Sequence, residues 1–130
     1  MSNNKIIPAT SKLKLMNGEE IELLMNFSAL NLLREKDKNM YSKINKFIFS
    51  SAGDINKLDL LEIAELIYSC YQMHQLFYQQ KIDKTFNDFI EVLDFDLENL
   101  MITYNTLLLG DKKKALKKYS ESVRQNQEEE

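Results

Sequence analysis

Glycine and proline are scarce in this chain: among 130 residues there are three glycines and one proline, Pro8. These two residues supply most of the turns that connect short β-strands, and proline inside a helix breaks it. The scarcity of glycine and proline therefore disfavours an all-β fold and favours helices. With 44% hydrophobic and 28% charged residues, the chain can bury one core and stay soluble. We therefore expect a small, mainly α, single-domain protein.

An N-terminal β-hairpin is the one predicted exception. Apolar and charged residues alternate over 12–15 and over 20–23, with Asn17-Gly18 between them, which is typical of a hairpin. A two-residue loop would put an apolar residue beside a glutamate. We prefer a three-residue loop, 16–18, with Gly18 in the left-handed conformation, because one face then becomes apolar and the other charge-matched. The predicted pairs are Leu13 with Ile21, Lys14 with Glu20, and Lys12 with Glu22.

Apolar residues recur at helical spacing over most of 28–109. In the first helical region, 28–50, Ser28 is a candidate cap with Phe27 and Leu32 as a hydrophobic staple. The run 34–39 contains no apolar residue. One long helix or two shorter ones both fit this region, and we favour a break.

A long helix is predicted over 56–80, beginning at the candidate cap Asn56. Its apolar arc is wide, so we expect it to lie centrally and to touch several neighbours. A short helix follows, capped by Thr85. The last helix is expected to begin near Asp94 or Asp96 and to stop at Gly110.

The two ends differ in composition from the region between them. Residues 1–10 are polar and are predicted to form a loose arm, and 11–110 are predicted to form the helical domain with its hairpin. Residues 111–130 have little to bury, so we expect a flexible charged tail that is dispensable for folding. Five lysines fall within Lys112–Lys118 of this tail.

No residue pattern in the chain points to catalysis, a cofactor or a metal. Cys70 and His74 have helical metal-ligand spacing, but no third or fourth ligand accompanies them, and packed core residues are the better interpretation. Asp94, Asp96 and Glu98 lack the glycine and the distant glutamate of a calcium loop, so helix capping explains them better. Neither phosphate-loop and dinucleotide-binding motifs nor hydrolase motifs occur. We expect no enzyme.

The cellular setting follows from three observations. The single cysteine cannot form an internal disulfide, which is typical of a reducing compartment. Neither a signal peptide nor an apolar run of membrane-spanning length is evident, so we expect a cytoplasmic protein without a membrane partner. The net charge of −3 and pI near 5.3 disfavour nucleic-acid binding by the whole surface. The 112–118 lysine cluster leaves a nucleic-acid-associated regulator as the alternative.

Aromatic and methionine side chains are abundant on the long helix. Most of them must serve the core, but some are expected to form a groove for a partner helix, since such side chains adapt to varied apolar surfaces. The candidate partner-binding residues are Tyr68, Met73, Tyr78 and Phe86.

A resemblance to a known family rests on four segments and on the order in which the predicted elements occur. The segments are 12–21 (KLKLMNGEEI), 67–74 (IYSCYQMH), 85–93 (TFNDFIEVL) and 97–107 (LENLMITYNTL). Over residues 10–110 the chain resembles the tail assembly chaperones of long-tailed bacteriophages and prophages of Gram-positive hosts. These segments are patterns of residue type rather than an invariant motif.

The resemblance implies a non-enzymatic role in virion morphogenesis in the bacterial cytoplasm. Such chaperones are thought to coat the helical tape-measure protein and to recruit tail-tube subunits, and they are absent from the finished virion. The family often makes a longer product by ribosomal frameshifting, and Lys112-Lys113-Lys114 is compatible with a slippery site. It has no catalytic residues to transfer to this chain, and self-association stays open.

Overall fold

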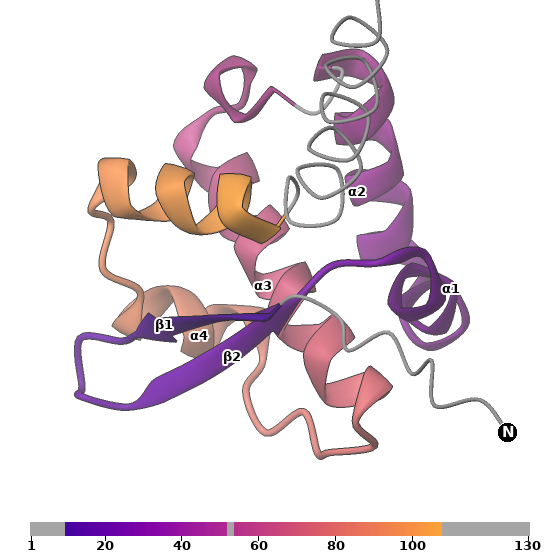
Figure 1. Cartoon of the computed structure of the whole chain (residues 1–130), viewed down its shortest axis with the longest axis horizontal. Coiled ribbons are helices and arrows are strands. Elements are labelled where there is room, and N and C mark those ends of the chain that lie inside the picture. The colour runs from indigo at the N-terminus through magenta and orange to yellow at the C-terminus, as the bar shows by residue number, and fades with distance from the viewer. Residues whose placement is uncertain (1–9, 52–53, 108–130) are drawn as a thin grey trace, which may run out of the picture.

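The computed structural model describes residues 10–51 and 54–107 and confirms a mainly α domain with an N-terminal hairpin (Figure 1). The final described segment, 97–107, is also helical. In chain order the labelled elements are β1 (Thr10–Lys14), β2 (Glu20–Leu24), α1 (Phe27–Lys36), α2 (Lys38–Ser51), the 3-10 turn η1 (Ile55–Lys57), α3 (Leu60–Phe77) and α4 (Phe86–Val92).

The hairpin has the predicted register. Leu13 pairs with Ile21, and both side chains are buried, while lysines face glutamates across the two strands. Gly18 has φ +89°, and its N–H donates to the Leu15 carbonyl at 3.0 Å. β1 begins at Thr10, which therefore belongs to the hairpin and not to the predicted arm.

Replacing Gly18 with alanine is expected to destabilise the domain by about 1–2 kcal/mol. No atom lies within 4 Å of the position that a Cβ would occupy, so the loss comes from the left-handed backbone and not from a clash. Gly18→Asn, which tolerates this conformation better, should lose less. Urea unfolding of the three proteins tests this, and equal losses for alanine and asparagine would contradict it.

The break between α1 and α2 falls at Asp37, inside the run where we favoured one. The Asp37 N–H donates to the Leu33 carbonyl at 2.7 Å, which closes α1. Its Oδ1 accepts from the N–H of Met40 at 3.1 Å, which caps the first turn of α2. One aspartate therefore ends one helix and begins the next.

Two predicted caps are wrong. Asn26 caps α1 in place of Ser28, and Phe27 is 90% exposed, so it makes no staple. Asp59 caps α3 in a reciprocal capping box with Glu62, whereas the predicted cap Asn56 lies in η1. In both places another polar side chain, Asn26 or Asp59, accepts a hydrogen bond from an N–H of the first helical turn. The helix predicted over 56–80 therefore begins one turn too early.

α3 is the centre of the fold, as its wide apolar arc predicted. Every residue from Ile63 to His74 is buried. α3 contacts β2, α1, α2 and α4. It runs diagonally through the molecule, with α1 and α2 on one side and the 97–107 helix on the other (Figure 1).

The last two helices begin as predicted. Thr85 and Asp88 form a capping box at α4. Asp96 accepts from the Asn99 N–H at 3.3 Å at the start of the 97–107 helix. The rest of the predicted arm, 1–9, and the predicted tail, 111–130, lie outside the described residues. In the part of the chain that the structure describes, no helix is long and apolar enough to cross a membrane.

Candidate functional site

The four residues predicted to bind a partner differ widely in exposure. Tyr68 is 5% exposed, Met73 0% and Tyr78 41%, while Phe86 is half-buried. Met73 belongs to the core instead of an accessible surface, because α3 is enclosed by its neighbours at this level. Binding at the other three stays a prediction.

Tyr68 joins the core to a surface groove. Its ring packs against Phe86 at a centroid distance of 5.5 Å and against Phe89 at 5.3 Å. Its hydroxyl donates to the backbone carbonyl of Lys84, which ties α3 to the segment that precedes α4. Burial, and after it the charges of Asp37 and Asp88, raise the pKa of Tyr68. The hydroxyl therefore stays protonated as a donor.

We call the hollow beside this ring the Tyr68 groove. It has a volume of about 330 Å³ and lies between the end of α1, the middle of α3 and the segment before α4. Its lining residues are Lys36, Asp37, Tyr68, Gln72, Ile82, Asp83, Lys84 and Thr85. Ile82 and the Tyr68 ring give it an apolar wall, and Asp37 and Gln72 give it hydrogen-bonding groups.

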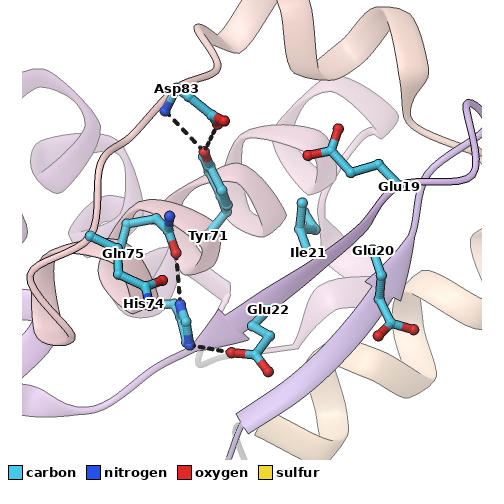
Figure 2. A pocket seen from close by; sticks show the side chains of 9 residues that line it. Glu19, Glu20, Ile21, Glu22, Tyr71, His74, Gln75 and Asp83 are labelled. Carbon is cyan, nitrogen blue, oxygen red and sulfur yellow. Dashed lines mark hydrogen bonds and ion pairs between the residues drawn. The ribbon is translucent and has the colours of Figure 1, made fainter.

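A second hollow, the carboxylate cleft, lies between β2 and the segment that follows α3 (Figure 2). It has a volume of about 290 Å³ and is lined by Glu19, Glu20, Ile21, Glu22, Tyr71, His74, Gln75, Gln80 and Asp83. The glutamates come from the hairpin, and Tyr71 and Asp83 lie across the cleft from them (Figure 2). A smaller hollow lined by Thr10, Glu22, His74, Tyr78 and Gln80 shares three of its residues with the cleft.

The polar groups of the carboxylate cleft are largely paired. His74 Nε2 lies 2.7 Å from Glu22 Oε2, and His74 Nδ1 lies 2.8 Å from Gln75 Oε1. Lys84 Nζ lies 2.6 Å from Glu19 Oε2, and this hydrogen bond raises the pKa of the lysine. The pairs connect the hairpin to α3 and to the segment before α4.

Tyr71 and Asp83 form a further close contact in the cleft. The Tyr71 hydroxyl donates to Asp83 Oδ1 at 2.6 Å and accepts from the Asp83 N–H at 3.2 Å (Figure 2). The hydroxyl donation lowers the pKa of Asp83, and burial raises the pKa of Tyr71. The pair therefore favours a neutral tyrosine and an ionised aspartate, which holds the 79–84 segment against α3.

Cys70 and His74 are packed residues, as the sequence predicted. Cys70 is fully buried, which raises the pKa of its thiol to about 12, so the thiol stays protonated and unreactive. Both ring nitrogens of His74 are already engaged by Glu22 and Gln75. Across residues 10–51 and 54–107, no group of three histidine, cysteine or acidic side chains is arranged to hold a metal ion.

Large exposed apolar side chains are spread along the described chain, and the two most exposed are Phe27 at 90% and Met16 at 70%. Leu60 and Leu61 at the start of α3 are 55% and 57% exposed. In and before the 97–107 helix, Phe95 is 46%, Leu97 41% and Ile102 58% exposed. The same helix buries Leu100, Tyr104 and Leu107 on its inner side.

Sequence reasoning missed the partnership of Asp37 with Gln72, 35 residues apart in the chain. Gln72 stands in the middle of the apolar run of α3, and Asp37 stands in the run without apolar residues. A glutamine that is buried in such a helix needs a hydrogen-bond partner. The presence of Gln72 within a mostly apolar run was therefore the signal in the sequence that such a partner exists.

No protein-family model matches the chain, and neither a curated protein nor a solved structure matches it.

Proposed function

We propose that the chain is a non-enzymatic tail assembly chaperone of a bacteriophage or prophage. In this proposal it binds the helical tape-measure protein and recruits tail-tube subunits in the cytoplasm of the bacterial host. The order of elements supports the proposal: a hairpin, a broken helix, a central helix, a short phenylalanine-rich helix and a closing helix follow one another as in the pattern that carries the resemblance.

The observation that carries the proposal is an exposed isoleucine, Ile102, on the outer side of the 97–107 helix. The inner side of this helix is already packed on the core through Leu100, Tyr104 and Leu107. Ile102 is nevertheless 58% exposed on the opposite side of the helix, whereas Leu97 lies at the exposed end of the packed side. A helix on the surface of a domain normally shows a polar outer face, and this isoleucine departs from that pattern. In the proposal, a helical client covers Ile102.

Ile102→Asp is expected to weaken binding to a tape-measure fragment at least about tenfold, because covering one such side chain contributes about 1.5–3 kcal/mol. Since Ile102 is 58% exposed, the thermal unfolding of the free protein should change little. Asn105→Asp is the matched control, because it adds the same charge at an exposed position of the same helix without removing an apolar group. Calorimetry or co-purification measures both.

Equal binding by wild type and Ile102→Asp would contradict the proposed surface. A gene neighbourhood without a tail-tube gene before and a very long helical gene after would contradict the proposed role. Co-purification of RNA that is lost with rising salt, without binding to any tail component, would favour the nucleic-acid-associated regulator that uses Lys112–Lys118.

A further inference from the structure

The tip of the hairpin loop holds Asn17, the only asparagine in the chain that is followed by glycine. Both Asn17 and Gly18 are exposed. Asparagine is a chemically labile residue, because the backbone nitrogen of the next residue can attack its side-chain amide. Gly18 has no Cβ, and no described atom beyond its chain neighbours lies within 4 Å of the position that a Cβ would take. The attacking nitrogen and water are therefore unobstructed at this loop.

The side chain of Asn17 is folded back over its own peptide bond to Gly18. Its Oδ1 accepts from the Glu19 N–H at 3.0 Å, which is the hydrogen bond of an Asx turn and brings Cγ towards the Gly18 nitrogen. The same N–H stabilises negative charge on Oδ1 when a nucleophile adds to Cγ, as a donor of an oxyanion hole does. The loop thus both orients and polarises the carbonyl that is attacked.

A single hydrogen bond restrains the nucleophile. The Gly18 N–H donates to the Leu15 carbonyl at 3.0 Å, and this bond must open before the nitrogen can attack. Loop tips open locally at low cost, and the loss of one exposed hydrogen bond slows a reaction that requires its opening by only about tenfold. The folded loop therefore delays the attack without preventing it.

We propose that Asn17 is a site of spontaneous deamidation in the folded protein, with water as the only co-reactant. The deprotonated Gly18 nitrogen forms a bond to Asn17 Cγ. The Cγ–Nδ2 bond then breaks, and ammonia leaves with a proton equivalent to the one that the nitrogen lost. Water opens the resulting succinimide ring: attack at Cγ gives aspartate, and attack at the backbone carbonyl carbon gives isoaspartate. No atom is oxidised or reduced, and no partner takes part, so the reaction is independent of the proposed function.

The two products affect the hairpin differently. Aspartate leaves the main chain unchanged and keeps an acceptor for the Glu19 N–H. Isoaspartate routes the main chain through Cβ and Cγ, which lengthens the loop that sets the pairing of Leu15 with Glu19. Glu19 also contacts Lys84 at 2.6 Å. Isoaspartate is therefore expected to loosen the hairpin from the segment before α4.

The test is incubation of the folded full chain at mildly alkaline pH in water labelled with heavy oxygen, followed by proteolysis and mass spectrometry. The fragment that contains Asn17 should gain the mass difference between a hydroxyl and an amino group, with the heavy oxygen incorporated, before any other asparagine reacts. A synthetic peptide of residues 12–21 gives the rate without the fold. The folded chain should react no more than about tenfold more slowly than this peptide.

Variants assign the reaction to this pair of residues. Asn17→Gln is the matched control: it keeps an amide at the loop tip but would have to close a larger ring, so it should give no product over the same incubation. Gly18→Ala is measured in the peptide, where strain in the folded loop plays no part. It should slow the reaction about tenfold, because a Cβ restricts the backbone conformations that reach Asn17 Cγ.

Urea unfolding separates the effects of the two products. Asn17→Asp reproduces the first product and should keep the wild-type midpoint, whereas the isoaspartate form, isolated by chromatography, should unfold at a lower urea concentration. Equal midpoints would contradict the loosening of the hairpin. An Asn17 that stays intact while the peptide converts would overturn the proposal, because the fold would then block the attack. Equally fast reaction at the other asparagines would overturn it as well, because Gly18 and the Glu19 N–H would then contribute nothing.

Discussion

Replacing Met73 with lysine is expected to unfold the chain, whereas replacing Tyr78 with lysine leaves it folded. Met73 is 0% exposed at the centre of α3, so the new ammonium would be buried without a partner. A penalty above about 5 kcal/mol is expected for such a group, which is comparable to the whole stability of a small domain. Tyr78 is 41% exposed at the end of α3, where a cation is compatible with the helix dipole.

Circular dichroism and urea unfolding of the two variants make the comparison. Met73→Leu is the control for volume and should lose less than about 1.5 kcal/mol. Tyr78→Lys should lose no more than about 2 kcal/mol, from contacts of its ring with His74 and Phe77. A cooperative unfolding transition of near-wild-type stability in Met73→Lys would show that α3 is not enclosed as described.

The burial of Met73 also shows where sequence reasoning ends. Because all residues from Ile63 to His74 are buried, including the polar Glu65, Ser69 and Gln72, α3 has no exposed face over this span that a period of 3.6 residues could identify. Periodicity can assign an inner face only when an outer one exists. Candidate binding residues on such a helix can be proposed from their residue type. Which of their side chains are accessible to solvent depends on how the neighbouring elements pack against the helix.

Local features were more predictable. The hairpin register follows from parity, because a shift by one residue would turn Leu13 and Ile21 to the surface. The break at Asp37 follows from the run 34–39, and the cap at Thr85 follows from its spacing to Asp88. Each of these depends on residues that are close in the sequence or paired by a short turn.

The candidate sites depend on contacts between distant residues. The Tyr68 groove needs Asp37 beside Gln72 and the 82–85 segment beside α3. The carboxylate cleft requires the hairpin glutamates to lie opposite Asp83. The contact of Lys84 with Glu19 joins the hairpin to the segment that contains Asp83. The local sequence pattern of these segments does not indicate which distant segment each one contacts. The Tyr68 groove and the carboxylate cleft can therefore be recognised only in the packed structure.

Stability is expected to fall steeply at alkaline pH because of Cys70 and Tyr104. Both side chains lie in the core, at 0% and 2% exposure. Burial raises the pKa of Cys70 from 9.0 to about 12. Burial, and after it the charge of Cys70, raise the pKa of Tyr104 from 10.0 to about 12. The two groups therefore stay protonated in the folded chain well after they ionise in the unfolded one.

The direction of the effect follows from proton binding. Below pH 9 both states keep these protons, and the full stability is present. Above pH 9 for Cys70 and above pH 10 for Tyr104, the unfolded chain releases a proton that the folded chain retains until about pH 12, so unfolding becomes more favourable by about 1.4 kcal/mol per pH unit for each group. At pH 11 the loss should reach about 3 kcal/mol from Cys70 and about 1.4 kcal/mol from Tyr104.

Urea unfolding between pH 8 and pH 11, in the presence of a reductant, measures this loss. Between pH 9 and 10 the cysteine ionises in the unfolded chain before the tyrosines do, so Cys70→Ala should flatten that interval, whatever it does to stability at pH 8. Above pH 10 the variant should still lose stability, because Tyr104 and the other buried tyrosines, Tyr68 and Tyr71, also have raised pKa values. An unchanged slope between pH 9 and 10 in Cys70→Ala would mean that the buried thiol does not carry the effect.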